Sequence, residues 1–372
     1  MRVLIGVVGD TPIVTTAEET AELIRSMRIR GAGRIARAGA SALGDFADTY
    51  TGGTLEGFLA DLKGASDTIL ASRPTAVSLW NGLHATVRGA SEASSLEEAR
   101  ALVSANAKAF CERSERAVEE IARIGARRIQ DGDVIMTHCN SSAALGVIKE
   151  AHRQGKDIRV YATESRPWRQ GILTVNDLAD AGVDVTLIID SAVRSVMRKV
   201  DKVFVGADTV TSQGALINKV GTSQLALAAH EARVHLYACA ETYKFSPMTL
   251  FGDAVTIEER DISEVVRPGE VRDSVKIFNP VFDSTPAAYI DAIVTELGMM
   301  SPGSVYDVMV RQLGDGIFSR ERFRWRAILT FTSGSPRTRT GTSFADTGSP
   351  PTFRWRRRRR PSRRSSPPGR GP

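Results

Sequence analysis

The chain has 372 residues, of which 42% are apolar and 25% are charged. These fractions exclude a wholly disordered chain and a collagen-like one. No apolar run approaches the roughly 18 residues that a membrane helix needs, and the run at residues 3–8 is too short for the core of a signal peptide. We therefore expect a soluble protein with no membrane partner.

The formal net charge of +6 is distributed unevenly. Residues 319–372 contain fifteen arginines and two acidic residues, so residues 1–318 carry a net negative charge. Binding to an anionic polymer is therefore an argument for the C-terminal segment alone. The three cysteines, Cys111, Cys139 and Cys239, lack the spacing of a disulfide framework or a zinc ribbon. A reducing, cytoplasmic compartment fits this pattern.

Apolar residues at three- and four-residue spacing predict helices in the first third of the chain. The predicted helices cover residues 17–27, 35–50, 55–72 and 95–123. This pattern contains no strand signal. We expect an all-helical N-terminal domain over residues 1–125.

After residue 132, short apolar runs alternate with helical stretches. The predicted strands cover residues 134–139, 158–163, 185–190, 203–207 and 234–239. Apolar strands separated by crossover helices indicate an α/β fold whose parallel sheet is covered on both faces. We expect this domain to cover residues 126–318. Because such sheets bind ligands outside the carboxyl ends of their strands, the residues after each run are the candidates for a site.

Residues 319–372 are rich in Arg, Pro, Ser and Gly, and they contain seven of the fifteen prolines. Such a segment cannot bury a core, so we expect a disordered tail. Its arginines suit an RNA-binding or partner-binding arm. The alternative, which we favour, is a misread or frameshifted end of a GC-rich coding sequence. A nucleic-acid partner is expected only if this tail is functional.

Cys139 ends a predicted strand and precedes a predicted helix that runs to about residue 152. The unpaired amides and the positive dipole end of a helix stabilise a thiolate, so this position predicts a lowered thiol pKa and a reactive Cys139. Ser141 and Ser142 lie where helix capping and anion contacts are needed. The alternative is a small core residue, and we keep that interpretation for Cys111 and Cys239.

Asp208 follows the predicted strand at residues 203–207, at the same sheet edge as Cys139. An apolar cleft raises the pKa of a carboxyl group, which can then hold a proton at neutral pH and act as a general acid. The alternative is a capping role in the following turn. The shared edge with Cys139 favours chemistry.

Several anion-binding signals lie at this same edge. Arg30-Gly31-Ala32-Gly33-Arg34 offers backbone amides and two guanidinium groups to a phosphate. Arg73 and Arg166 each precede a proline, which holds the guanidinium on a bend. Lys219 and Lys244 add donors beside strand ends. Each cation alone is explained by an ordinary salt bridge, but together they predict a doubly anionic substrate.

Seven ordered motifs between residues 16 and 313 closely resemble archaeal ribose-1,5-bisphosphate isomerase. This group belongs with the methylthioribose-1-phosphate isomerases and the regulatory subunits of translation initiation factor 2B. The motifs are Arg30-Gly31-Ala32-Gly33 with Ile35-Ala36-Arg37, Arg73-Pro74-Thr75-Ala76-Val77, the segment from Asp133 to Cys139, Glu164-Ser165-Arg166-Pro167, Gly206-Ala207-Asp208, Asn218-Lys219-Val220-Gly221-Thr222 and the segment from Asn279 to Pro286.

The resemblance implies a helical domain followed by a Rossmann-like domain. It also implies conversion of ribose 1,5-bisphosphate to ribulose 1,5-bisphosphate in nucleotide degradation, without a metal, nicotinamide or other cofactor. Cys139 would be the base and Asp208 the acid. The substrate-binding residues would be Arg30, Gly31, Ala32, Gly33, Arg73, Ser141, Ser142, Arg166, Asn218 and Lys219. A homo-oligomer, either a dimer or a hexamer, is expected. Ser165 departs from the usual Thr.

Two other functions stay open. A methylthioribose-1-phosphate isomerase would need an apolar pocket in place of the second anion site. Arg34, Arg37 and His138 favour the bisphosphate. A regulatory subunit of a translation-factor complex would bind without turnover, but the presence of both Cys139 and Asp208 argues against it.

Overall fold

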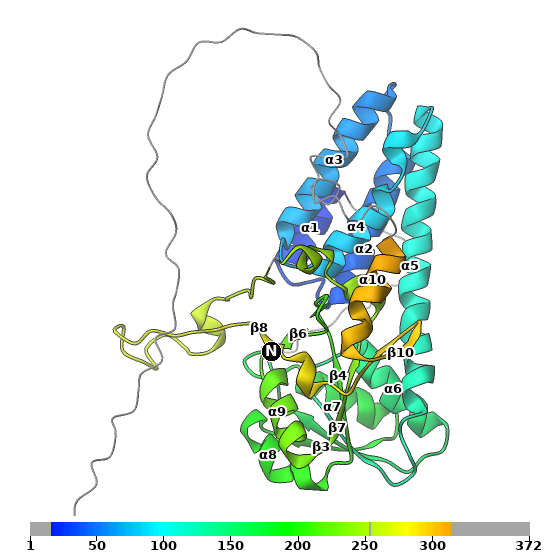
Figure 1. Ribbon diagram of the computed structural model, residues 1–372. Coiled ribbons are helices and arrows are strands. Elements are labelled where there is room, and N and C mark those ends of the chain that lie inside the picture. Colours follow the sequence, from blue (N-terminus) through cyan, green and yellow to red (C-terminus); the bar gives the residue numbers. More distant parts are fainter. Residues whose placement is uncertain (1–15, 253, 314–372) are drawn as a thin grey trace, which may run out of the picture. The chain divides into compact units, whose positions relative to one another are not determined.

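The structure is a computed structural model that describes residues 16–252 and 254–313 (Figure 1). These residues lie in the first of two compact units, Met1–Thr330. The predicted tail at residues 319–372 lies outside the described residues. Among the described helices, none combines the length and the apolar character that crossing a membrane requires.

Five α-helices form the first part of the described chain. They are α1 Ala17–Arg25, α2 Ala32–Thr49, α3 Leu55–Ser72, α4 Val77–Val87 and α5 Leu96–Ala126. Side-chain oxygens cap three of them at the N-terminus, namely Thr16, Thr54 and Ser95. Their apolar faces share one core that includes Ile24 and Phe58. These helices therefore form one packed bundle.

Helix α4 was not predicted from the sequence. Its buried face carries Ser78, Gly82 and Thr86 beside Leu79 and Leu83. Because polar and small residues occupy half of this face, they conceal the apolar period that identifies a helix. The other four helices were predicted within a few residues of their observed ends.

The second part of the chain is built on a seven-stranded sheet in the order β10-β9-β7-β4-β1-β2-β3. Its strands are β1 Val134–Thr137, β2 Arg159–Thr163, β3 Asp184–Ile188, β4 Lys202–Gly206, β7 His235–Cys239, β9 Ala292–Thr295 and β10 Gly298–Met300. All pairs are parallel except β9 with β10. From β1 the chain proceeds to one side, and from β4 it proceeds to the other. The strand order therefore reverses between β1 and β4.

Helices cover both faces of this sheet. They are α6 Ser142–Arg153, α7 Gly171–Asp180, α8 Val193–Val196, α9 Thr222–Ala232 and α10 Val305–Leu313. Val203 and Val205 of β4 belong to the core shared with α8, α9 and α10, whereas Phe204 belongs to the core shared with α5, α6 and α7. This alternation follows from the two-residue period of a strand. The largely buried strands β1, β2, β4 and β7 read as apolar runs, which is why they were predicted. Strand β3 was also predicted, although its side chains are exposed or half-buried, and β9 and β10 were not predicted.

A smaller antiparallel sheet of β5 Thr209–Val210, β6 Leu216–Lys219 and β8 Phe282–Thr285 was not predicted. Its strands have two to four residues, too few for a clear alternation of polar and apolar side chains. In this sheet Lys219 pairs with Phe282, and Asn218 pairs with Asp283. The sheet therefore brings the Asn218-Lys219 motif beside a segment that lies more than sixty residues later.

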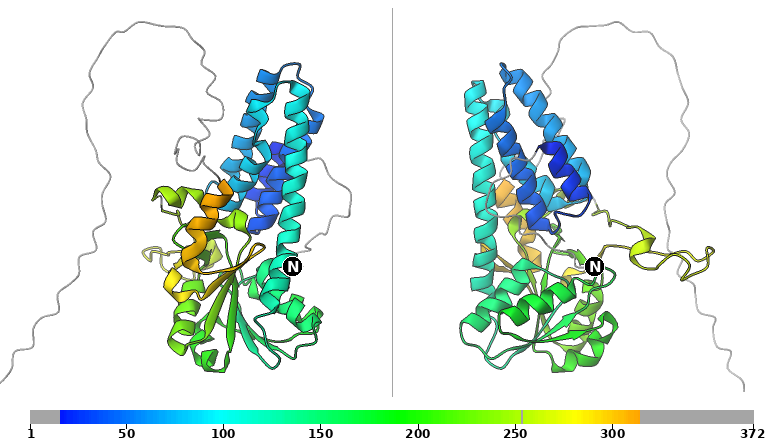
Figure 2. Two further views of the ribbon diagram at one scale, coloured as in Figure 1. Left: turned by 45° about the vertical axis from the view of Figure 1, so that its right-hand side comes forward. Right: turned by 180° about the vertical axis from the view of Figure 1, so that it is seen from behind.

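The predicted fold class is confirmed, because helices come first and a mostly parallel sheet of Rossmann-like order follows. Helix α5 packs on α2 and also on α6 and β9. Figure 2 shows α5 passing from the helical bundle along the side of the sheet. The division into domains at residues 1–125 and 126–318 therefore stays a proposal.

Replacing Phe204 with alanine should reduce the free energy of unfolding by about 3–5 kcal/mol. The Phe204 side chain is fully buried, and its ring stacks on Tyr237 at 4.9 Å between centroids. Urea denaturation would measure the loss. Leu297→Ala is the control, because Leu297 is 60% exposed and its removal should change stability by less than about 0.5 kcal/mol. Equal losses in both variants would contradict this account of the core.

Candidate active site

Cys139 and Asp208 flank the point where the strand order reverses. Cys139 lies two residues after β1, and Asp208 lies two residues after β4. These two strands are parallel neighbours, with Ile135 opposite Lys202. The carboxyl ends of such a strand pair leave a crevice, because the connections lead away on opposite sides. The two predicted catalytic residues therefore share the usual ligand-binding edge of this type of sheet.

The backbone of Cys139 is held in a strained conformation. Its φ is 66°, which is uncommon for a residue with a Cβ. The Cys139 N–H donates to the Ser165 Oγ at 2.8 Å, and its carbonyl accepts from the Thr174 Oγ1 at 2.6 Å. Hydrogen bonds on both sides therefore fix the turn that presents the thiol.

The predicted lowering of the Cys139 pKa is wrong for the free protein. Burial raises the pKa of this thiol to about 11, against the opposing effects of the Lys219 charge and the Asn140 N–H. The helix starts later than expected: Ser141 is the N-cap of α6 and accepts from the Ala144 N–H at 3.3 Å. Cys139 thus lies outside the first turn, where the helix dipole acts most strongly. At neutral pH the free protein holds Cys139 as a thiol.

Asp208 shows the raised pKa that its position predicts. Burial is the main cause, and the charges of Lys244, Lys219 and Arg73 oppose it. Its backbone N–H donates to the Ile217 carbonyl at 3.0 Å, which ties the residue to β6. The carboxyl group can therefore hold a proton well above the usual range for aspartate, as a general acid requires.

Two buried lysines near Asp208 differ in their partners. Lys244 is 6% exposed, and its Nζ lies 2.6 Å from the Glu241 carboxylate, which is itself 1% exposed. Lys219 is also 6% exposed, but within residues 16–252 and 254–313 it has no ion pair. Its Nζ lies over the Phe282 ring, 5.6 Å from the centroid. Burial lowers the pKa of Lys219, while the nearby Cys139 and Asp208 raise it.

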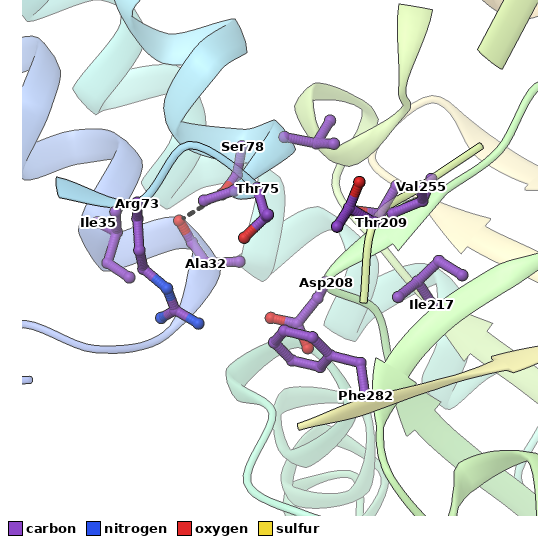
Figure 3. A pocket seen from close by; sticks show the side chains of 13 residues that line it. Ala32, Ile35, Arg73, Thr75, Ser78, Asp208, Thr209, Ile217, Val255 and Phe282 are labelled. Atoms are coloured by element: carbon purple, nitrogen blue, oxygen red, sulfur yellow. Dashed lines mark hydrogen bonds between the residues drawn. The ribbon is translucent and has the colours of Figure 1, made fainter. Parts of the chain in front are cut away.

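A pocket opens between the helical bundle and the end of β4 (Figure 3). In this view the Arg73 guanidinium and the Asp208 carboxyl group are directed into the same space. The complete lining is Ala32, Ile35, Arg73, Thr75, Ala76, Val77, Ser78, Asp208, Thr209, Ile217, Val255, Thr256 and Phe282. Cys139 does not belong to this lining. The pocket therefore joins the predicted acid to two predicted substrate ligands, Ala32 and Arg73.

The Arg73 guanidinium has one nitrogen in an ion pair and another that makes no hydrogen bond within the described chain. Its Nη2 lies 2.8 Å from a Glu258 carboxylate oxygen, and the same carboxylate accepts from the Arg260 Nε at 3.0 Å. The Arg73 Nε is buried and has no hydrogen-bond partner among the residues that the structure describes. An anion in the pocket would satisfy this donor. Glu258 was not predicted, because it comes from a loop far along the chain and no motif marks it.

The predicted substrate ligands fall into two groups, and the first group, residues 30–33, lies at the start of α2. Gly31 is the N-cap of α2 with a φ of 93°, and a Cβ on Gly33 would lie 2.8 Å from the Tyr243 hydroxyl. These glycines and Ala32 begin the helix at the pocket. Arg30 lies 5.6 Å from the Trp168 ring centroid.

The side chains of the other group are engaged in hydrogen bonds within the protein. The Arg166 Nη2 donates to the Val265 carbonyl at 3.2 Å, and the Asn218 amide donates to the Thr222 hydroxyl at 3.0 Å. Ser141 caps α6, and Ser142 is its first residue. Arg37, which was offered as support for a second phosphate, instead donates to the Ser114 hydroxyl at 3.1 Å. That part of the argument for a bisphosphate has no support in this geometry.

Sequence comparison shows the family. The model of the initiation factor 2 subunit family matches residues 28–302, which is most of the chain. The chain belongs to this family. The resemblance stated from the seven motifs is therefore confirmed. The match covers helices α2 to α5 of the bundle, the large sheet and both predicted catalytic residues, and it begins after α1.

Proteins with different names are similar to this chain. A protein of Archaeoglobus fulgidus named "Ribose 1,5-bisphosphate isomerase" is 53% identical over 80% of this chain and 93% of its own length. A second protein of that organism, named "Putative methylthioribose-1-phosphate isomerase", is 36% identical over 77% of this chain and 88% of its own length. A Pyrococcus horikoshii structure described as translation initiation factor eIF-2B has a TM-score of 0.66 and 33% identity, and covers 77% of this chain and 97% of its own.

Proposed function

We propose that this chain is an aldose–ketose isomerase that converts ribose 1,5-bisphosphate to ribulose 1,5-bisphosphate. The observation that carries the proposal is Lys219, a buried cation without an ion pair in the described chain, whose charge acts on both Cys139 and Asp208. A buried charge is costly unless a partner compensates it. An anionic substrate bound between Cys139 and Asp208 would supply that partner.

The relative with 53% identity and the name ribose 1,5-bisphosphate isomerase supports this substrate over a monophosphate. The unpaired Arg73 Nε supports an anion at the pocket as well. Lys219 and Arg73 come from different parts of the fold, since Lys219 ends β6 and Arg73 follows α3. Two separate cationic positions suit a substrate with a phosphate at each end.

The chemistry needs an acid and a base. A sugar phosphorylated at C1 has no free aldehyde, so its ring must open with the phosphate attached. In our proposal Asp208 donates its proton to the ring oxygen as the bond from C1 to that oxygen breaks. The Cys139 thiolate takes the C2 proton, and the electron pair forms the double bond between C1 and C2. Return of that proton to C1, with transfer of the C2 hydroxyl proton to Asp208, gives the ketone.

The raised pKa of Cys139 determines which protonation state is active. Below the pKa of Asp208 both groups are protonated, and above about pH 11 both have lost their protons. Between these limits the pair holds one proton. The active form, a thiolate beside a carboxylic acid, is a minority of that singly protonated state, because the carboxyl group is the stronger acid. The charge of Lys219 lowers the pKa of both Cys139 and Asp208, and so favours loss of a proton from either group.

The pH dependence of kcat/KM should follow this scheme. Activity should rise as pH passes the raised pKa of Asp208, stay level between that pKa and the pKa of Cys139, and fall as pH approaches about 11. Initial rates measured from pH 4 to pH 11 would give the profile. A rising limb centred near pH 8.5, the ordinary thiol pKa, would contradict the assignment.

A methylthioribose-1-phosphate isomerase remains the second candidate. The apolar side chains of Ile35, Ile217, Val255 and Phe282 in the pocket lining favour it, because a methylthio group needs an apolar surface. The relative with 36% identity and that name is consistent with this alternative.

The deciding experiment incubates the full chain with each sugar phosphate and follows the appearance of a ketone carbon by ¹³C NMR. Ribose 1,5-bisphosphate should be converted. The rates for ribose 1-phosphate, ribose 5-phosphate and methylthioribose 1-phosphate should be lower by a factor of at least about one hundred. Conversion of methylthioribose 1-phosphate alone would select the second candidate. Turnover of none of the four would support a binding subunit. Light scattering on the same sample tests the expected dimer or hexamer.

A further inference from the structure

A continuous line of hydrogen bonds joins the Cys139 turn to the turn at residues 220–221 that follows Lys219, which we call the Lys219 turn. The Cys139 N–H donates to the Ser165 Oγ at 2.8 Å, and this oxygen lies 3.2 Å from the Thr163 Oγ1. The Thr163 Oγ1 lies 2.6 Å from the Nδ1 of His138. The other ring nitrogen of His138, Nε2, lies 2.9 Å from the carbonyl oxygen of Val220, the residue after Lys219.

The two ends of this line fix its direction. The Val220 carbonyl can only accept, so the His138 Nε2 carries the hydrogen. In a neutral ring the Nδ1 then accepts, and the Thr163 hydroxyl is its donor. Burial lowers the pKa of His138, which favours this neutral ring against the opposing charge of Asp190. One tautomer therefore satisfies both ring nitrogens.

Close packing leaves the ring of His138 little room to move. His138 is 2% exposed, Thr163 is 1% exposed and Ser165 is fully buried. A Cβ added to Gly221 would lie 2.9 Å from the Cε1 of His138. Gly221 also has a φ of 104°, so a larger residue there would meet both a backbone and a steric penalty. The turn after β6 therefore fits against the imidazole face.

We propose that His138, acting through Thr163 and Ser165, is a positioning residue that holds the Cys139 turn in register with the Lys219 turn. This inference rests on the proposed function only in naming the reaction that needs the two turns held in place. A displacement of about 1 Å at a reacting group typically costs on the order of a hundredfold in rate. The φ of 66° at Cys139 makes such a support necessary, because that conformation persists only where its surroundings hold it.

The test uses two variants and one matched control. Thr163→Val keeps the shape of the side chain and removes the hydroxyl that lies closest to the His138 Nδ1, which leaves only the longer contact of 3.4 Å from that nitrogen to the Ser165 Oγ. His138→Phe keeps a ring and removes every hydrogen bond of the imidazole. Thr86→Val is the control, because Thr86 is likewise a buried threonine whose Oγ1 is hydrogen-bonded, to the Gly82 carbonyl at 2.9 Å in α4. Each protein is assayed for kcat, KM and melting temperature.

A second readout does not depend on turnover. Iodoacetamide alkylation of the peptide that contains Cys139, followed by mass spectrometry across pH, reports the pKa of that thiol. Burial is the largest cause of the raised pKa of this thiol, and the charges of Asp208 and Asp190 raise it further. The charge of Lys219 and the Asn140 N–H lower it. Release of the turn should expose the Cys139 thiol and so remove the largest cause of its raised pKa. The alkylation midpoint should therefore move down from about 11 toward the ordinary thiol value.

We expect Thr163→Val and His138→Phe to lose at least about tenfold in kcat with KM within about twofold of wild type, and to show the lowered alkylation midpoint. Thr86→Val should lose some thermal stability and change neither readout. If both site variants melt earlier but keep the wild-type kcat and midpoint, the positioning role is refuted. If wild type does not isomerise ribose 1,5-bisphosphate, the proposed function fails, and the alkylation midpoints alone decide whether His138 holds the turn.

Discussion

Replacing Cys139 with serine should reduce the turnover of ribose 1,5-bisphosphate by about a thousandfold or more. A serine hydroxyl stays protonated at any pH at which the protein folds, so removal of the C2 proton should fail while substrate binding survives. The measurement is kcat from ketone formation, with binding followed separately by calorimetry. Cys111→Ser is the control, because Cys111 lies in α5 near the Arg37 carbonyl and should be dispensable.

Asp208→Asn should cause a loss of comparable size, since the amide keeps the shape but cannot donate and recover a proton. Because both groups serve one reaction, the double variant should be little slower than either single variant. Near-native turnover by Cys139→Ser would show that another group takes the C2 proton. Additive losses in the double variant would show that the two residues act in separate steps.

Lys219→Met and Lys244→Met should have opposite effects on stability. Lys219 has no ion pair within the described chain, so its replacement by an apolar side chain of similar length should raise the free energy of unfolding by about 1–3 kcal/mol. Lys244→Met would leave the buried Glu241 carboxylate without its cation, and should lower the free energy of unfolding by about 3–5 kcal/mol. Urea denaturation without substrate measures both changes.

The more stable Lys219→Met protein should nevertheless lose about a hundredfold in kcat/KM for ribose 1,5-bisphosphate. Higher stability together with lower kcat/KM would show that the Lys219 charge serves the substrate and reduces the stability of the folded protein. A Lys219→Met protein that is both less stable and fully active would mean that the lysine has a structural role. In that case the observation on which the proposed function rests would be lost.

The strands that carry the proposed acid and base were predictable because they are buried on both faces. Continuous apolar runs gave β1 and β4, and the rule that ligands bind at the carboxyl ends of strands then selected Cys139 and Asp208. The strands β6 and β8 were not predictable in the same way. Their pairing depends on contacts across more than sixty residues, and each is too short to show a period.

The electrostatics of the site were predicted only in part. The raised pKa of Asp208 was expected, but the raised pKa of Cys139 was not, because the predicted strand was two residues too long and the helix begins only at Ser142. Ion pairs between segments that are far apart in the sequence could not be predicted either, because no sequence pattern marks them. Glu258 beside Arg73 is such a case, since neither residue type nor spacing connects a loop carboxylate to a helix end.

The left-handed backbone at Cys139 also limits which amino acids this position can hold. Side chains branched at the β-carbon are strongly disfavoured at a positive φ. Threonine is therefore disfavoured, although its hydroxyl would offer an oxygen at the same place. Serine, asparagine and aspartate tolerate the conformation better, but none of them ionises as a thiol does. Substitution at this position in related chains should thus be restricted to unbranched side chains even where catalysis has been lost.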